Sequence, residues 1–319
     1  MIPDQFSETV ARLLARVETV IVGKRPVVEM TVIGFLCGGH LLIEDIPGVG
    51  KTMLARALAR SVDLDFKRIQ FTPDLLPSDI TGVSIYRPGE GCFQFHPGPI
   101  FAHVVLADEI NRATPKSQSA LLEAMEEFQV TVDGTAHPLP RPFFVIATEN
   151  PIEYEGTYSL PEAQLDRFLM RLNIGYPTPA DEVMILDRQM LQHPIETVTP
   201  VVSAEEIAEL QATVRRVHVE ASLKAYMVAL TNASRQHEAV ELGASPRGSI
   251  AQMRCAQGLA ALRGRDYVVP DDVKYVAEAV LGHRLILKPQ RRLQGVTPAQ
   301  VVRELLESVP VPVVPGASP

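Results

Sequence analysis

The stretch from Leu41 to Thr52 reads Leu-Leu-Ile-Glu-Asp-Ile-Pro-Gly-Val-Gly-Lys-Thr, and it decides the fold. Its apolar start predicts a buried strand over residues 41–43, a tight turn follows over residues 47–50, and a helix-forming run begins at Met53. Strand, glycine loop and helix in this order are typical of a phosphate-binding loop. Backbone N–H groups at such a loop and at the helix N-terminus converge on an anion, which the helix dipole also favours.

The residue types of this loop suit the phosphates of a nucleotide. We expect Gly48 and Gly50 to let the backbone approach where a Cβ would collide. Lys51 supplies a positive charge for the β- and γ-phosphates, and Thr52 supplies a hydroxyl ligand for magnesium. The usual pattern has glycine five residues before Gly50, where this sequence has Asp45. The Gly-x-Gly-Lys-Thr core in this context still favours phosphate binding over an ordinary strand–turn–helix.

Length and composition set the broad class. The chain has 319 residues, enough for two domains with a substantial core. Its 30 basic and 38 acidic residues give a net charge of −8, so a nucleic-acid footprint is not evident. Cys37, Cys92 and Cys255 are odd in number and scattered, which suits a reducing cytosol. With neither a signal peptide nor an apolar stretch of ~20 residues, we expect a soluble cytoplasmic protein.

A second strand end carries paired carboxylates. Residues 104–107 are an apolar strand that ends in Asp108-Glu109. The carboxyl ends of parallel strands are where such a sheet presents its ligands. At this distance after a phosphate loop, we expect Asp108 to hold the magnesium shell and Glu109 to orient and polarise the attacking water.

Three further polar residues have a functional and a purely structural interpretation. Asn150 follows a buried strand over residues 143–148, where it could bind a γ-phosphate or the lytic water, or equally cap the turn before the next proline. Arg167 ends a short helix over residues 160–168; it is either a solvated surface residue or a guanidinium supplied to a neighbouring subunit. Arg247 lies in the first turn of its helix, an unfavourable place for a cation, which favours a ligand role such as reaching the nucleotide from a lid.

Gly23 joins two predicted helices near the expected position of the adenine, although a glycine between helices needs no ligand to explain it. Two hairpins are predicted over about residues 80–97 and 129–138, the second with an Asp133-Gly134 turn. In the first, Phe93 and Phe95 share one face, which we expect to be packed. A metal site at Cys92 and His96 is disfavoured because no second pair of ligands lies nearby in the sequence.

These elements in this order resemble an AAA+ ATPase, and most closely the MoxR family. The resemblance covers nearly the whole chain and includes the irregular Asp45; Glu149 stands where glutamine is more usual. The segments that carry it are 44–52, 98–101 with 107–113, 119–127, 147–151, 165–168 and 244–247.

The resemblance implies an α/β fold: an AAA+ P-loop core with a five-stranded parallel sheet in an α/β/α arrangement over residues 1–178, an all-α lid over 179–308 and a Pro-rich tail over 309–319. It implies ATP and Mg²⁺ as cofactors. The roles that it implies are Walker A for Lys51 and Thr52, with loop contacts from Gly48, Val49, Gly50 and Met53; Walker B for Asp108 and Glu109; sensor 1 for Asn150; arginine finger for Arg167; and sensor 2 for Arg247.

The resemblance further implies a hexameric ring with nucleotides between subunits, acting as a chaperone-like activator of a protein client with a partner that carries a von Willebrand factor A domain. A nucleic-acid motor of the McrB or helicase type is the alternative, against which the acidic balance argues. An ATP-switched scaffold of low turnover, as in magnesium chelatase, is another, and intact Glu109 and Arg167 argue against it. A GTPase is disfavoured because the sequence has no Asn-Lys-x-Asp signature. Arg112 or Arg171 could act in trans instead of Arg167.

Overall fold

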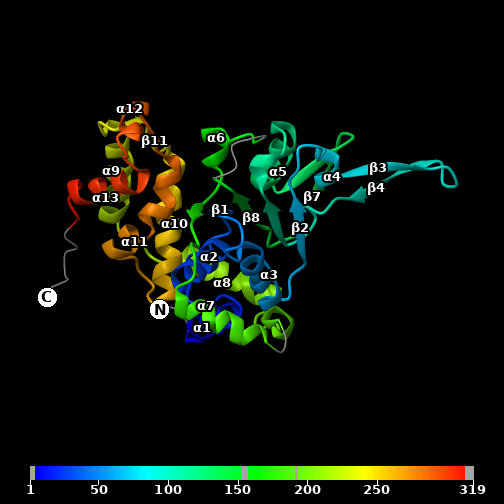
Figure 1. Cartoon of the computed structure of the whole chain (residues 1–319), viewed down its shortest axis with the longest axis horizontal. Helices are drawn as coiled ribbons and strands as arrows, with labels where there is room; N and C mark the ends of the chain where they lie inside the picture. Colours follow the sequence, from blue (N-terminus) through cyan, green and yellow to red (C-terminus); the bar gives the residue numbers. More distant parts are fainter. Residues whose placement is uncertain (1–3, 152–156, 191–192, 313–319) are drawn as a thin grey trace.

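Five parallel strands form the centre of the molecule (Figure 1). The computed structural model describes residues 4–151, 157–190 and 193–312. The strand order is β2-β5-β8-β1-β9, and each neighbouring pair is parallel. The strands are β1 (Leu41–Glu44), β2 (Phe66–Gln70), β5 (Val104–Asp108), β8 (Phe144–Glu149) and β9 (Met170–Leu172).

The polar residues that follow the strands meet at one edge of this sheet because the strands run in register. Glu44 faces Glu149 across β1 and β8, and Gln70 faces Asp108 across β2 and β5. The apolar residues before them bury both faces of the sheet. Alternate residues of β1 point to opposite sides, as the pleat of a strand requires.

Helices cover both faces, and each helix contributes to one of two apolar cores. The larger core lies under the N-terminal helices, α3 and the helical C-terminal part, and the smaller lies under α5. The helices of the α/β part are α1 (Asp4–Glu18), α2 (Arg25–Leu36), α3 (Lys51–Ser61), α4 (Pro77–Thr81), η1 (Ile110–Arg112), α5 (Pro115–Glu127) and α6 (Glu162–Leu165). Because α6 ends at Leu165, the expectation that Arg167 ends this helix was wrong; it follows the helix.

Both predicted hairpins are present. They are β3 (Gly82–Arg87) with β4 (Cys92–Pro97), and β6 (Gln129–Val132) with β7 (Thr135–Pro138). Asp133 and Gly134 have φ of 50° and 77°, the two left-handed residues of a type I′ turn. The β3–β4 hairpin projects from the body at the right of Figure 1.

The expectation that Phe93 and Phe95 are both packed is only half right. The Phe95 ring stacks on that of His137 with centroids 3.9 Å apart. Phe93 lies farther along the projecting hairpin, where its side chain is 71% exposed and contacts Tyr86.

The C-terminal part is helical; its segments from residue 221 onward lie at the left of Figure 1, and those over residues 179–216 lie at the bottom centre. Its helices are α7 (Pro179–Gln189), η2 (Pro194–Thr197), α8 (Ala204–Arg216), α9 (Ala221–Gln236), α10 (Pro246–Leu262), α11 (Pro270–Leu281), η3 (Gly282–Arg284), α12 (Pro289–Leu293) and α13 (Pro298–Ser308). A small pair of strands, β10 (Val240–Leu242) and β11 (Ile286–Leu287), was not predicted. A capping box begins α8, since Ser203 Oγ accepts from the Glu206 N–H at 3.2 Å and the Glu206 carboxylate accepts from the Ser203 N–H at 2.7 Å.

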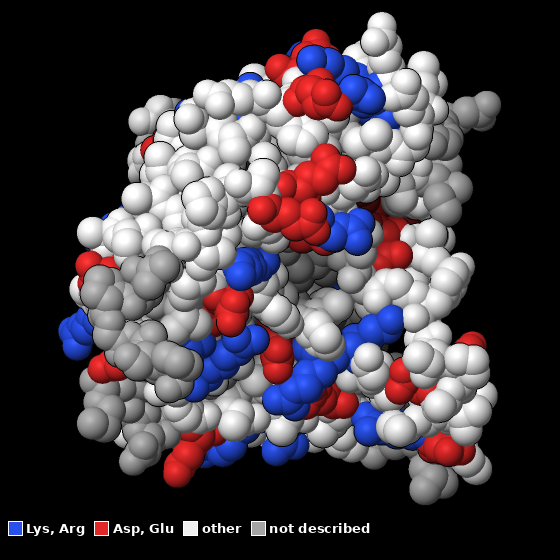
Figure 2. Space-filling model, turned by 90° about the vertical axis from the view of Figure 1, so that its left-hand side faces the viewer, with Lys and Arg blue, Asp and Glu red and all other residues white. Residues whose placement is uncertain are grey.

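Within residues 4–151, 157–190 and 193–312, no helix combines the length and the apolar character that crossing a membrane requires. On the face shown in Figure 2, acidic and basic side chains are interspersed among uncharged residues. The division of the chain after residue 178 stays a prediction, and residues 313–319 of the predicted tail lie outside the described part.

Candidate functional site

The phosphate loop connects β1 to α3, and its glycines are required by backbone conformation. Gly48 and Gly50 have φ of 86° and 94°, values that residues other than glycine rarely adopt. A Cβ at either position would meet no atom of the chain within 4 Å. The space at both Cβ positions is therefore free of this chain's own atoms, and the collision of a Cβ with a bound phosphate stays a prediction.

Lys51 and Asp45 tie this loop to the neighbouring strands. The Lys51 ammonium is buried and donates to the backbone carbonyl oxygens of Asp45 at 2.5 Å and Glu149 at 3.3 Å. One Asp45 carboxylate oxygen accepts from the N–H groups of Ile174 and Gly175, both at 2.6 Å. Asp45 thus replaces the usual glycine with a buried anchor that fixes the loop to the segment after β9.

The paired carboxylates, Asp108 and Glu109, lie at the end of β5, and Thr148 of the neighbouring strand β8 contacts both residues. Thr148 donates its hydroxyl to Asp108 at 2.7 Å and accepts from the Glu109 N–H at 2.8 Å. Glu109 has φ of 58°, a left-handed conformation that turns the chain sharply after β5. Such strain in a residue other than glycine is common at functional sites.

Two side chains of β2 reach the same carboxylates. Arg68 binds one Asp108 oxygen through Nε at 2.9 Å and Nη2 at 2.6 Å. Gln70 donates to Glu109 at 2.7 Å, and Arg112 binds the same Glu109 oxygen at 3.0 Å. Two partners therefore hold one oxygen of the Glu109 carboxylate, Oε2.

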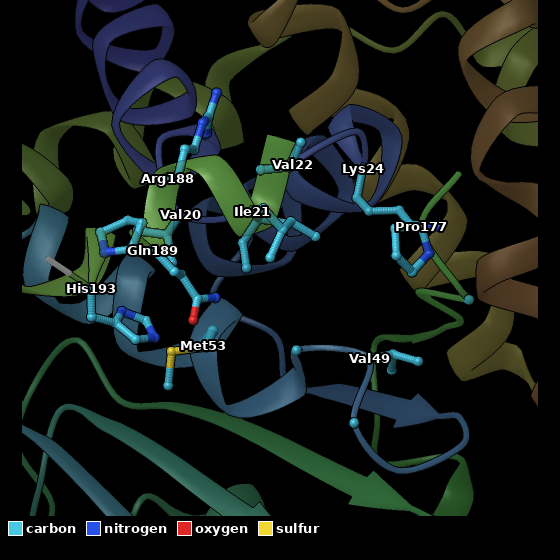
Figure 3. A pocket seen from close by; sticks show the side chains of 15 residues that line it. Val20, Ile21, Val22, Lys24, Val49, Met53, Pro177, Arg188, Gln189 and His193 are labelled. Carbon is cyan, nitrogen blue, oxygen red and sulfur yellow. The ribbon is translucent and has the colours of Figure 1, made fainter. Parts of the chain in front are cut away.

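A cavity of about 210 Å³ opens beside the phosphate loop (Figure 3). Its walls come from the α1–α2 linker, the phosphate loop, the segment after β9, α7 and residues just beyond α7; the residues are Val20, Ile21, Val22, Lys24, Gly48, Val49, Gly50, Met53, Gly175, Pro177, Ile185, Arg188, Gln189, His193 and Pro194. Apolar walls next to a phosphate-binding loop suit the base and sugar of a nucleotide.

Gly23 lies in the α1–α2 linker, between two residues that line this cavity. It has φ of 70°, and a Cβ there would lie 2.2 Å from the Asp181 carboxylate of α7. Its neighbour Lys24 donates to the Tyr176 carbonyl oxygen at 2.7 Å, which holds the linker against the segment after β9. Gly23 thus permits the close approach of linker and α7, while Val22 and Lys24 line the cavity.

The donor set fits magnesium with a nucleotide. The Thr52 hydroxyl at the start of α3 and the Asp108 carboxylate are hard oxygen donors of the kind that magnesium prefers. The open space over Gly48 and Gly50 would receive the phosphates. No group of three or more His, Cys, Asp or Glu that could hold a metal by itself occurs in the described residues, so the phosphates would have to complete the shell.

Arg167 and Arg247 lie together, away from the phosphate loop of their own chain. They line one hollow with Gly39 and His40, which precede β1, whereas Lys51 follows β1. Arg167 also precedes Met170, which faces Leu41 at the start of β1. The two ends of such a strand are roughly 10 Å apart. That Arg247 binds a nucleotide therefore stays a prediction.

Both arginines are fixed by the same neighbours. Arg167 binds one oxygen of Glu126 at 3.2 Å, and Arg247 binds the other. Asp166 connects the two parts of the protein here, accepting from Ser245 at 2.7 Å and from Arg284 at 2.8 Å. The pair of arginines thus lies at the junction of the α/β part and the helical part.

The two alternative arginines bind carboxylates within the chain. Arg112 contacts Glu109, as described above, and Arg171 binds Glu44 at 2.6 Å. Glu149 lies beside Glu44, and burial together with the Glu44 charge raises the pKa of Glu149 to about 7. Asn150, the next residue, is buried, and its carbonyl oxygen accepts from Asn111 at 3.3 Å.

Comparison with known proteins supports this architecture. Residues 40–170 match the model of the ATPase family associated with various cellular activities (AAA), and residues 232–305 match the AAA lid domain. The chain is 43% identical to Chaperone MoxR1 of Mycobacterium tuberculosis over 313 residues, which cover 95% of this chain and 82% of the relative. It is 31% identical to Protein MoxR of Methylorubrum extorquens over 334 residues, 96% of each chain. The chain belongs to the MoxR family of AAA+ ATPases.

Other relatives agree with this membership. A protein of Bacillus subtilis named YeaC, described as uncharacterized, is 54% identical over 302 residues, 95% of this chain and 94% of the relative. The crystal structure of a candidate ATPase from Cytophaga hutchinsonii superposes with a TM-score of 0.90 at 39% identity and covers 97% of this chain and 96% of that chain. The MoxR assignment and the AAA+ fold with a helical lid, both expected from the sequence, are confirmed.

Sequence reasoning missed several residues of the MoxR site. Arg68 and Gln70 are two residues apart in β2 and so share one face of the sheet, which was the available signal. Thr148 follows an apolar run and resembles a core residue. The cavity residues of α7, Arg188 and Gln189, have no local motif and are recognised only once the fold brings them beside the loop.

Proposed function

We propose that this MoxR protein hydrolyses ATP between the subunits of a ring and uses the energy to remodel or activate a protein client in the cytoplasm. The observation that carries the proposal is the separation of its two sets of charged groups. Lys51 lies at one end of the sheet, and Arg167 and Arg247 lie at the other. A nucleotide bound at the first set would meet the second set only on a neighbouring subunit.

Within the nucleotide site, each residue has a defined task. The backbone of residues 48–52 and the Lys51 ammonium would bind the phosphates, with Met53 and the cavity walls around Gly23 beside the base. Thr52 and Asp108 would hold magnesium, which, when bound, neutralises charge on the phosphates. Glu109 would orient and polarise the attacking water, and the buried Asn150 would hydrogen-bond the γ-phosphate or that water.

The arginines act in trans in this proposal. Arg167 would neutralise charge that develops during phosphoryl transfer on the neighbouring subunit. We extend the role to Arg247, because both guanidiniums are held by the same carboxylate, Glu126. A ring, in which every subunit offers one phosphate loop and one arginine pair, completes all its sites; six subunits are the number that the family suggests.

The proposal also includes a protein client and a protein partner. The name of the Mycobacterium tuberculosis relative includes the word chaperone, and we carry that activity over to this chain. We propose a protein client, with a partner that bears a von Willebrand factor A domain. The projecting β3–β4 hairpin, with its exposed Phe93, supports contact with another protein.

Two substitutions test the core of the proposal. Glu109→Gln should retain ATP but lose hydrolysis, because an amide cannot polarise water while Lys51, Thr52 and Asp108 still hold the phosphates. Lys51→Ala should weaken nucleotide binding itself. Steady-state turnover and equilibrium binding of a fluorescent ATP analogue measure the two effects, and near wild-type turnover by Glu109→Gln would remove Glu109 from the mechanism.

A further inference from the structure

A second, larger cavity lies where the helical part meets the sheet, at the end opposite the phosphate loop. It has a volume of about 570 Å³, within the range of small-molecule binding sites. One wall comes from Gly38 after α2, Phe128 after α5 and Arg141 before β8. The other wall comes from α8 and α10 of the helical part. Gly38, Phe128 and Arg254 also line the adjoining hollow of Arg167 and Arg247, whereas Arg141 and Arg215 line this cavity alone.

The lining is strongly cationic. Arg141, Arg215 and Arg254 all line the cavity, and no aspartate or glutamate does. Within the described residues, none of the three guanidinium groups forms an ion pair or a hydrogen bond, although the chain as a whole has a net charge of −8. By contrast, Arg167 and Arg284 in the adjoining hollow are both paired with carboxylates. All three arginines are exposed, so an anion that enters the hollow can reach their unpaired guanidiniums.

The cavity is built to leave this space open. Along α8, Ala204, Ala208, Gln211 and Arg215 recur every three or four residues, so they share the face that lines it. The two alanines make room, and Gln211 and Arg215 add polar groups. The Arg141 guanidinium lies 3.9 Å from the centre of the Phe128 ring, which fixes its orientation.

We propose that this cavity is a binding site for a small anion that carries two or more phosphate groups. Guanidinium groups match phosphate oxygens in pairs, so three of them around one hollow select multivalent phosphate over a single carboxylate. Because the walls belong to the sheet on one side and to α8 and α10 on the other, a bound anion would connect the two parts of the molecule. The site would therefore act as a regulatory one, separate from ATP.

Calorimetric titration of Lys51→Ala protein with sodium tripolyphosphate tests the proposal without depending on ATP hydrolysis. Lys51→Ala weakens phosphate binding at the loop, so the remaining heat reports on the second cavity. We expect saturable binding of about one tripolyphosphate per chain. Adding Arg141→Gln with Arg215→Gln should lower the affinity at least about tenfold, or about 1.4 kcal/mol. Arg303→Gln, which removes an exposed arginine of α13 instead, should leave the affinity unchanged.

An uncharged substitution that fills the cavity distinguishes binding inside the cavity from attraction to the general surface charge. Ala208→Phe fills the space but keeps all three arginines, and it should lower the affinity as strongly as the double substitution. It also carries the test if the double variant fails to fold. Saturable binding that survives both changes would overturn the proposal, as would the lack of any saturable binding at millimolar tripolyphosphate. Loss of ring assembly in the arginine variants, without tripolyphosphate binding in the parent, would assign these arginines to a subunit contact and overturn it too.

Discussion

Arg167 and Arg247 bind the two oxygens of one carboxylate, that of Glu126. Arg167 belongs to the α/β part and Arg247 to the first turn of α10 in the helical part, so their meeting point is also a junction between the two parts. Since the Glu126 side chain is partly exposed, its hold on the arginines is exchangeable. The γ-phosphate of a neighbouring subunit would compete with Glu126 for both.

Mixed rings test this trans arrangement. Arg167→Ala alone and Lys51→Ala alone should each be nearly inactive. Mixed together, they form some interfaces that pair an intact phosphate loop with an intact arginine, so part of the ATPase activity should return. An arginine finger contributes on the order of 10³-fold or more to the rate, which makes the recovery easy to measure. Arg247→Ala should behave in the same way as Arg167→Ala.

A matched control mixes two variants whose defects both lie in the part of the site that a subunit provides for its own nucleotide. Lys51→Ala mixed with Glu109→Gln cannot create an intact site, because both residues act on the nucleotide of their own chain, and its activity should stay low. If mixing with Arg167→Ala restores no more activity than this control, although the subunits exchange, then Arg167 does not act in trans.

The second prediction concerns the resting ion pair between Arg68 and Asp108. Magnesium at Asp108 must compete with the Arg68 guanidinium, which binds the same carboxylate at 2.6 Å. Arg68→Gln should therefore lower the magnesium concentration needed for half-maximal nucleotide binding. A partly exposed ion pair is worth up to about 1 kcal/mol, so we expect a shift of up to about fivefold. Titration of magnesium against the fluorescence of a bound nucleotide analogue measures it.

The control for that shift is an ion pair remote from the site. Arg25 binds Glu18 and Glu29 on the surface, and Arg25→Gln should leave the magnesium dependence unchanged. If Arg68→Gln instead raised the magnesium requirement, Arg68 would support the metal site and not compete with it.

These two predictions differ in how far the sequence alone could lead to them. Lys51, Asp108 and Glu109 belong to local patterns, because the loop and the strand ends are continuous in sequence. Which strand lies beside which is not local. The contact of Arg68 with Asp108 depends on β2 being next to β5, and Thr148 reaches Asp108 only because β8 lies on the other side.

The same limit applies to Arg247. Its place in the first turn of α10 favours a ligand role, which stays a prediction. The direction in which it points depends on how the helical part packs on the sheet, through Asp166, Ser245 and Arg284. That packing involves residues about 80 to 120 positions apart. No local pattern encodes it, so the sequence supported a ligand role and the fold supplied the partner.

The third prediction is a pH dependence of stability at Glu149. Burial and the neighbouring Glu44 charge raise its pKa from 4.5 to about 7. Between these values the folded protein holds a proton that the unfolded chain releases, so stability falls as the pH rises from about 4.5 to 7. Glu149→Gln removes this loss. It should raise the free energy of unfolding by about 3 kcal/mol at pH 8 and by little at pH 4.5, on the scale of 1.36 kcal/mol per pKa unit.

Urea denaturation at both pH values measures the difference. Glu127→Gln, an exposed carboxylate at the end of α5, should change the stability by similar small amounts at both. An equal effect of Glu149→Gln at pH 4.5 and pH 8 would show that folding does not shift the pKa of Glu149. The variant should also retain nucleotide binding, because glutamine keeps a polar side chain at this strand end.

The last prediction concerns the β3–β4 hairpin as the contact with a protein client. Tyr86 and Phe93 pack on each other, with ring centroids 5.2 Å apart, and both are largely exposed. Tyr86→Ser with Phe93→Ser should therefore leave ATP hydrolysis and ring assembly intact while it lowers the affinity for the client at least tenfold. The client for this assay is the protein captured from the native host by rings of Glu109→Gln. Replacing residues 87–91 with a short Gly-Ser turn should have the same effect.

Phe95 provides the matched control on the same strand. Phe95→Ser removes the stacking on His137 and should destabilise the protein, because this ring, unlike that of Phe93, packs on the body of its own chain. Loss of client binding only in Phe95→Ser would mean that the exposed rings are not the contact. Undiminished binding and stimulation in both the double variant and the Gly-Ser variant would direct the search to the β6–β7 hairpin and its Asp133-Gly134 turn.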